Sequence, residues 1–263
     1  MGQGLPAPHN LTAARGCEAA IREEGGVPAT VGVLGGRLRI GLSDQELELI
    51  AAGSVKVSSR DIGPAAAVRT VGATTVAATV RAARMAGIRF MATGGIGGIH
   101  RGHPEDQSAD LVEMAGAPVA VFCAGAKIIL DLRLTLERLE SLSVPVLGYG
   151  TDEFPAFYTR RSGCAVSARV DSATEAAQTL HAIWELGGRG VVIAIPPPAE
   201  LEGAEEMVRR AVAEIPDAGG AGLTPRLLSR IADLSGGRSV DLNVDLVINN
   251  ARIAAQVAHE YFA

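Results

Sequence analysis

Residues 90–127 of this 263-residue chain read FMATGGIGGIHRGHPEDQSADLVEMAGAPVAVFCAGAK. One apolar run, residues 88–93, and a second, residues 118–123, each predict a strand that is followed by small residues. The first strand leads into a glycine-rich loop, and the second ends shortly before Lys127. Ligand sites of α/β proteins lie at the carboxyl ends of strands, so we expect both loops at one edge of the same sheet.

Strand and helix patterns alternate outward from this stretch. Further strands are predicted at 27–34, 37–41, 54–57, 144–147 and 190–195. Helices are predicted at 11–24, 44–52, 73–86, 108–115, 127–140, 173–186, 203–214, 224–234 and 239–262. The alternation indicates an α/β chain, with a three-layer α/β/α sandwich around a mixed, mostly parallel sheet. We expect residues 1–263 to form a single domain.

Composition excludes several classes of protein. The net charge of −5 does not suggest a nucleic-acid footprint. No apolar run approaches the roughly 18 residues of a membrane span, and no leader pattern is visible, so we expect a cytoplasmic protein without a membrane partner. The cysteines, Cys17, Cys123 and Cys164, are odd in number and scattered, which favours reduced thiols over a disulfide framework.

The lysines are informative because the chain otherwise uses arginine. Among 24 basic residues, the lysines are Lys56 and Lys127. Genomic bias explains the total, yet an amine can form an imine and a guanidinium cannot. Lys127 is predicted to follow a buried strand and to begin a helix, and both burial and the helix N-terminus lower the pKa of an amine. A Schiff-base lysine is one reading, and a lysine that reaches solvent or binds phosphate is the other.

The loop between the two strands carries polar groups of two kinds. The glycines after Thr93, together with His100 and Arg101, are typical of a site for an oxyanion such as a phosphate. Glycine richness alone is weak evidence, and the loop lacks the dinucleotide fingerprint. Glu105, Asp106 and Asp110 offer oxygen ligands to a divalent cation, although a solvated acidic loop explains the same residues equally well.

Several segments together resemble a known family. They are Val27–Thr30, Val55–Ser58, Gly72–Val76, Thr93–Gly102, Ser108–Leu111, Cys123–Lys127, Phe154–Phe157 and Asn249–Arg252. The set resembles the pseudouridine-5′-phosphate glycosidase, or indigoidine synthase A-like, family, and it covers nearly the whole chain in order. The resemblance implies reversible cleavage of the C–C bond between uracil and ribose 5-phosphate through a lysine imine. An imine is an electron sink, which makes cleavage of a C–C bond feasible.

The resemblance also assigns roles to individual residues. It implies that Lys127 forms the imine and that Asp106 binds manganese. The substrate-contacting positions of the family fall on Lys56, Val76, Ser108, Ala109 and Asp110. From the matched segments we also expect substrate contacts at Thr93, His100, Arg101 and Asn249. A small-molecule sugar phosphate or C-nucleotide is the implied partner, and a homotrimer is the implied assembly.

Two departures from the family keep other functions open. The family's proton-donor glutamate lies in a strand, Leu-Glu-Ser-Thr, which would precede Met1, and the first carboxylate here is Glu18. Either the sequence starts after that strand or the protein has lost the group, and a retired sugar-phosphate-binding relative is therefore one alternative. The segment Ile195–Ala199 replaces a polar family motif. The second alternative is a C-ribosyl synthase that joins ribose 5-phosphate to another acceptor.

Overall fold

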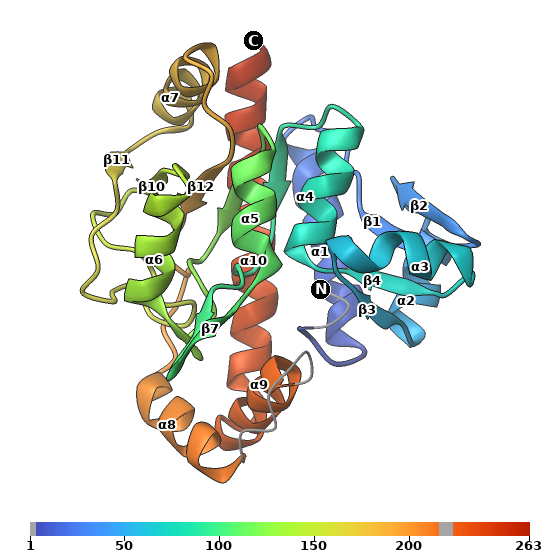
Figure 1. Cartoon of the computed structure of the whole chain (residues 1–263), viewed down its shortest axis with the longest axis vertical. Coiled ribbons are helices and arrows are strands. Elements are labelled where there is room, and N and C mark those ends of the chain that lie inside the picture. The colour runs from blue at the N-terminus through green and yellow to red at the C-terminus, as the bar shows by residue number, and fades with distance from the viewer. Residues whose placement is uncertain (1–3, 216–222) are drawn as a thin grey trace.

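The computed structural model describes residues 4–215 and 223–263, and its centre is a five-stranded parallel sheet (Figure 1). The strands run in the order β11-β10-β12-β8-β5. Their bounds are Phe90–Ala92 (β5), Ala120–Cys123 (β8), Val146–Tyr149 (β10), Ala168–Val170 (β11) and Val191–Ala194 (β12). Every residue of β8 and β12 is buried, as expected for parallel strands that are covered by helices on both faces.

The two faces of this sheet belong to separate hydrophobic clusters. Val121 and Cys123 of β8 pack with residues of α5 and α6, whereas Ala120 and Phe122 pack with residues of α7 and α10. The helices are Ala109–Gly116 (α5), Leu132–Ser141 (α6), Ala173–Glu185 (α7) and Arg238–Phe262 (α10). Side chains alternate across a strand, so one run of apolar residues fills both clusters. The predicted three-layer α/β/α arrangement is confirmed.

A second, smaller sheet supplies the mixed strand directions. Its order is β2-β1-β4-β3, with β1 antiparallel to both neighbours and β3 parallel to β4. The strands are Val31–Leu34 (β1), Arg37–Ile40 (β2), Val55–Val57 (β3) and Gly72–Thr74 (β4). β4 corrects the sequence prediction, which placed these residues in a helix. The helix α4, Val76–Met85, begins only after Thr75, whose side chain accepts a hydrogen bond from the Ala78 N–H.

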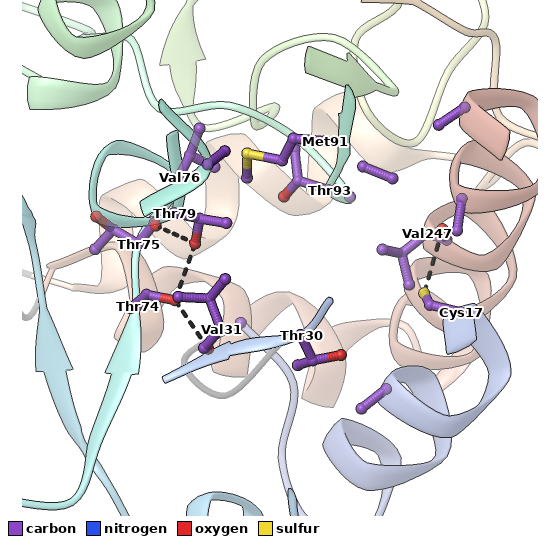
Figure 2. A pocket seen from close by; sticks show the side chains of 18 of the residues that line it. Cys17, Thr30, Val31, Thr74, Thr75, Val76, Thr79, Met91, Thr93 and Val247 are labelled. Carbon is purple, nitrogen blue, oxygen red and sulfur yellow. Dashed lines mark hydrogen bonds between the residues drawn. The ribbon is translucent and has the colours of Figure 1, made fainter. Parts of the chain in front are cut away.

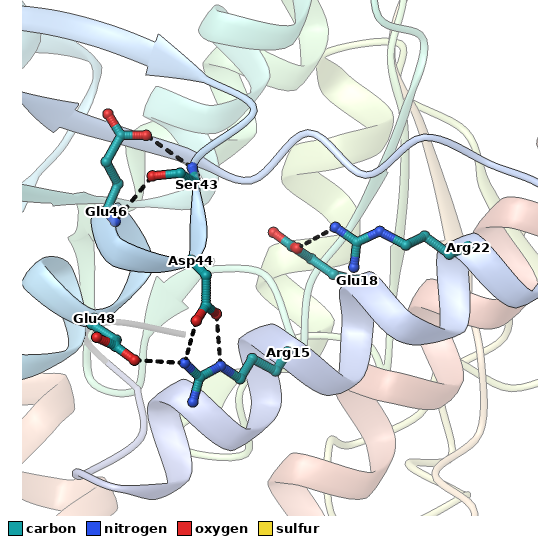
Figure 3. Close-up of polar contacts among 7 residues, drawn as sticks. All are labelled: Arg15, Glu18, Arg22, Ser43, Asp44, Glu46 and Glu48. Carbon is teal, nitrogen blue, oxygen red and sulfur yellow. Dashed lines mark hydrogen bonds and ion pairs between the residues drawn. The ribbon is translucent and has the colours of Figure 1, made fainter.

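The N-terminal helix α1, His9–Glu23, packs along α10 and is tied to α2, Asp44–Ala52 (Figure 3). Arg15 donates to the carboxylates of Asp44 and Glu48. The predicted capping box of α2 is present, because Ser43 and Glu46 exchange hydrogen bonds between side chain and main chain. Pro8 occupies the N-cap position of α1, and the Asn10 amide donates to the Ala51 carbonyl of α2.

A small antiparallel sheet lies beside the carboxyl ends of β5 and β8. Its order is β7-β6-β9, and its strands are Ile99–His100 (β6), His103–Gln107 (β7) and Leu130–Asp131 (β9). The sequence predicted a helix from Lys127 onward. That boundary is wrong, because residues 127–129 form a turn and α6 begins at Leu132. Asp131 caps the helix, and its side chain accepts a hydrogen bond from the Leu134 N–H.

The sequence prediction missed two short helices between β3 and β4. They are a 3-10 helix, Ser59–Asp61 (η1), and the helix α3, Ile62–Ala67. Helices α8, Ala204–Glu214, and α9, Leu223–Leu234, agree with the predicted ranges. Both lie at the end of the molecule away from the carboxyl end of α10 (Figure 1). Within residues 4–215 and 223–263, no helix is long and apolar enough to span a membrane.

Candidate active site

A cavity of about 1160 Å³ lies between the edge of the main sheet and the second sheet. Figure 2 shows Met91 and Thr93 on one side, Val31 and Thr74 opposite, and Cys17 closing the cavity from α1. β5 is the outermost strand of its sheet, and its three residues line this space. Lys127 and Lys56 line the same cavity, so the described structure brings both lysines of the chain together.

Lys127 is fixed by main-chain contacts to the glycine loop. Ala126 forms an isolated parallel bridge with Ile96, and the Lys127 N–H donates to the Ile96 carbonyl over 3.2 Å. The chain then turns, because the Leu130 N–H donates to the Lys127 carbonyl over 2.9 Å. The parallel pairing of β5 and β8 therefore continues past both strand ends. This confirms the expectation that the two loops meet at one sheet edge.

Burial lowers the pKa of the Lys127 amine. The desolvation is the largest cause, and the positive charge of Lys56 acts in the same direction, while the carboxylate of Asp110 raises the pKa. From the sequence we also expected a helix N-terminus at Lys127 to lower this pKa. That effect is absent because α6 begins five residues later, at Leu132. A lysine held in this way is a nucleophile closer to neutral pH than a solvated lysine.

Asp110 connects the glycine loop to the start of two helices. It lies in the first turn of α5, is only 4 % exposed, and accepts hydrogen bonds from the Ala77 N–H over 2.8 Å and the Gly97 N–H over 2.7 Å. One oxygen atom therefore faces the N-terminus of α4 and the other faces the loop. The carboxylate lies in the cavity wall, where its charge acts on Lys127, and the substrate contact expected of Asp110 stays a prediction.

The glycines of the loop permit close packing. A Cβ atom on Gly97 would lie 2.3 Å from the Ser108 hydroxyl, and one on Gly98 would lie 2.3 Å from the Thr135 hydroxyl. Gly125, with φ of +80°, lies against the Pro155 carbonyl. From the sequence we expected these glycines to form an anion-binding loop. In the structure they bring the loop, α5 and α6 into contact, and one of the loop N–H groups is used by Asp110.

The other predicted side chains reach the cavity from separate elements. Lys56 comes from β3, and Val76 is the first residue of α4. Ser108 caps α5 by accepting from the Asp110 N–H, and Ala109 follows it. Thr93, which donates its N–H to the Phe122 carbonyl, continues the line of β5. All five line the cavity with Asp110 and Lys127.

The β6–β7 hairpin places the candidate metal and anion ligands. His100 and Asp106 line the cavity, and His100 Nε2 lies 4.0 Å from Asp106 Oδ2. Arg101 was expected at the anion site, but its guanidinium donates to the carbonyls of Ile128 and Leu130 and lies outside the cavity lining. Arg101 therefore contacts the chain just after Lys127.

The asparagine of α10 that lines the cavity is not the predicted one. Asn249 is partly buried and lies outside the cavity lining. Its neighbour Asn250 is 1 % exposed and donates to the Thr93 carbonyl over 2.8 Å. Asn243, two turns earlier, lines the cavity beside Gly94. The signal available in the sequence was a polar residue on the apolar face of a long amphipathic helix.

Two further residues of the cavity wall were missed. Glu18 of α1 is buried and accepts hydrogen bonds from the Thr30 hydroxyl and the Arg22 guanidinium. Phe157 has φ of +66°, which is rare for an aromatic residue, and its ring packs on Gly94 and Gly95. The loop at 152–158 folds back over the end of β8, since the Phe157 N–H donates to the Ala124 carbonyl.

The sequence comparisons place the whole chain in one family. A family model described as "Indigoidine synthase A like protein" matches residues 1–260. The pseudouridine-5′-phosphate glycosidase of Deinococcus radiodurans is 50 % identical over 99 % of this chain and 87 % of its own length. The enzyme of the same name from Nocardioides sp. is 50 % identical over 99 % of this chain and 89 % of its own length.

Solved structures show the same fold. An indigoidine synthase A-like protein from Thermotoga maritima superposes with a TM-score of 0.90 at 33 % identity, over 97 % of this chain and 88 % of its own. The prealnumycin C-glycosynthase AlnA, solved in complex with ribulose 5-phosphate, superposes with a TM-score of 0.87 at 38 % identity, over 95 % of this chain and 86 % of its own. The family match, the relatives and the fold agree: the chain belongs to the indigoidine synthase A-like family.

Proposed function

We propose that this protein reversibly cleaves the C–C glycosidic bond of pseudouridine 5′-phosphate, giving uracil and ribose 5-phosphate through an imine on Lys127. The observation that carries the proposal is the partly buried Lys127 amine, whose pKa is lowered by desolvation, in a cavity shared with Lys56 and Asp110. The relatives that are 50 % identical over 99 % of the chain support the choice of substrate, because they are named for this reaction.

The imine explains how a carbon–carbon bond is broken without a leaving oxygen. The Lys127 nitrogen bonds to C1′ as the C1′–O4′ bond breaks, and the O4′ oxygen takes up the proton that the amine loses, so the ribose ring opens. The nitrogen lone pair then forms the C=N bond as the pair of the C1′–base bond moves to the base carbon. That carbon takes up a proton, and water then hydrolyses the imine to release ribose 5-phosphate and the free amine. Asp110 is the fixed anion that offsets the charge of the iminium, because it lies beside the amine and is held by two N–H groups.

A C-ribosyl synthase is the second candidate, and one specific observation favours it. AlnA, whose name describes C-glycoside formation, shares the fold at 38 % identity. The same imine on Lys127 serves that reaction, with another acceptor carbon attacking C1′. The two functions differ in the acceptor and not in the use of Lys127.

The decisive experiment traps the intermediate and measures turnover in parallel. The protein is incubated with ribose 5-phosphate and reduced with borohydride, and the adduct is located by peptide mass mapping. Uracil release from pseudouridine 5′-phosphate is followed by chromatography. An adduct on Lys127 with uracil release supports the glycosidase. An adduct without uracil release favours the synthase, and no adduct favours a sugar-phosphate-binding relative.

Replacing the amine tests the imine directly. Lys127→Arg keeps a cation but cannot form an imine, so both adduct and turnover should disappear. Lys56→Arg is the matched change at the second lysine of the cavity, and it should leave a trappable adduct on Lys127. Turnover that survives in Lys127→Arg would contradict the mechanism.

We further propose that Asp106 binds manganese in an open site. In the described parts of the chain, no three His, Cys, Asp or Glu side chains gather as a metal-binding group. Asp106 offers a carboxylate in the cavity wall, which fits an ion that completes its coordination with water. Electron paramagnetic resonance of free Mn²⁺ should show weaker binding by Asp106→Asn, and unchanged binding would exclude Asp106 as a ligand. The homotrimer and the cytoplasmic location remain predictions.

A further inference from the structure

Arg101 holds the main chain that follows Lys127. Its Nε donates to the Leu130 carbonyl over 3.0 Å and its Nη2 donates to the Ile128 carbonyl over 2.9 Å. The guanidinium fork thus binds two carbonyl groups, two residues apart, with separate N–H donors. A planar fork matches this arrangement, whereas a lysine offers one point charge.

The segment that Arg101 binds determines where the Lys127 side chain begins. Residues 127–130 form a tight turn, closed by the Leu130 N–H and the Lys127 carbonyl, and lie between the parallel bridge at Ala126 and the strand β9. No helix ladder fixes this turn. β9 has only two residues, paired with Ile99 and His100 of β6, and Arg101 is the next residue on that partner strand.

The position of Arg101 argues against direct contact with substrate. Arg101 is exposed and lies outside the cavity lining, while His100 and Asp106 of the same hairpin line the cavity. Two of its donor nitrogens are occupied by carbonyl oxygens. Ile128 and Leu130, whose carbonyls hold the guanidinium, are each only 2 % exposed.

We propose that Arg101 is a positioning residue for Lys127 and not an anion-binding residue. The guanidinium fixes the turn at residues 127–130, and the turn fixes the direction from which the amine meets C1′. This inference rests on the proposed imine function of Lys127. It predicts a loss in the chemical step and little change in the binding of the phosphorylated substrate.

Three variants separate positioning from anion binding. Arg101→Ala removes the fork, Arg101→Lys keeps the charge, and Arg133→Ala is the control because Arg133 is an exposed arginine on the neighbouring helix α6. We expect both Arg101 variants to lower kcat by roughly 10-fold, with KM for pseudouridine 5′-phosphate within about 2-fold of wild type. Arg133→Ala should keep the wild-type values.

Chemical rescue supplies a readout that a general loss of stability would not give. Guanidinium chloride at tens of millimolar should restore part of the kcat of Arg101→Ala, since the vacated site is exposed, and should leave Arg133→Ala unchanged. Sodium chloride at the same concentration should not restore it. A rise in KM with unchanged kcat would assign Arg101 to anion binding, and unchanged values of both would remove any role.

Hydrogen exchange tests the positioning without reference to the reaction. The Leu130 amide closes the turn, so it should exchange at least 10-fold faster in Arg101→Ala than in wild type. The Leu134 amide, which donates to the capping side chain Asp131 of α6, should exchange at the same rate in both proteins. If wild-type protein forms no borohydride-trapped adduct, the proposed function fails, and the exchange rate still decides the structural claim. Equal Leu130 exchange in both proteins would overturn that claim.

Discussion

Lys127 places an ionisable amine inside the protein, and this has a consequence for stability. Burial lowers the pKa of Lys127 from its ordinary value of 10.5, so between the lowered pKa and 10.5 the unfolded chain binds more protons than the folded protein. The free energy of unfolding therefore rises with pH across that window, and the full penalty applies below the lowered pKa. Functional groups commonly reduce stability in this way.

Lys127→Met tests this sign. Methionine keeps much of the length and removes the charge, so the variant should be more stable than wild type at pH 7 and the difference should shrink toward pH 10. Urea unfolding at a series of pH values measures both quantities. An equal dependence on pH in the two proteins would contradict the burial of a titrating amine at this position.

Asp110→Asn should weaken the site in a different manner. Each carboxylate oxygen accepts a main-chain N–H, and an asparagine has only one acceptor oxygen, so one donor would face an NH₂ group. We expect a loss of about 1–3 kcal/mol of stability. Asp106→Asn is the control, since Asp106 has a partly exposed side chain. Because the Asp110 charge raises the Lys127 pKa, imine formation in Asp110→Asn should also shift to lower pH.

The Cys123–Lys127 loop, which follows β8, contacts the 152–158 loop at Gly125. Gly125 has φ of +80°, and an added Cβ would lie 1.8 Å from the Pro155 carbonyl oxygen. Gly102 has φ of +76° with open space around it. Both glycines require the left-handed region, so Gly125→Ala and Gly102→Ala share the backbone strain and differ in the clash.

Gly125→Ala should therefore cost about 1–3 kcal/mol more than Gly102→Ala, because overpacking is added to the strain. Thermal or urea unfolding of the two variants provides the comparison. Similar losses in both would mean that the Pro155 loop moves away freely, and that its packing contributes little to the site.

Local sequence signals predicted most elements because their chemistry is local. Ser43 and Glu46 cap α2 with their own side chains, and Ser108 starts α5 as expected. The helix predicted at 127–140 is present as α6, but its predicted start at Lys127 was wrong because Ile128 and Leu132 have helical spacing but belong to different elements. Periodicity cannot separate a buried turn from a buried helix, and the Arg101 contacts that stabilise this turn come from another strand.

At the scale of the whole molecule, the meeting of β5 and β8 could be predicted from their loops, whereas the cavity could not. Lys56 reaches Lys127 only because a second sheet folds against α4, and β4 of that sheet resembles the start of a helix in sequence. The resemblance to the family placed Lys56 in the site. The roles of Asn243 and Glu18 depend on how α1 and α10 pack, which no short motif encodes.

The outermost position of β5 makes part of the cavity wall a surface of peptide groups. The Arg89 carbonyl and the Thr93 N–H bond to β8, so alternation along the strand turns the peptide groups of Phe90 and Ala92 away from β8, and both residues line the cavity. Substitution of side chains does not change the hydrogen-bonding groups of such a wall. Amide hydrogen exchange should therefore be fast at Ala92 and slow at Thr93. A ligand that fills the cavity should slow the exchange of the Ala92 amide.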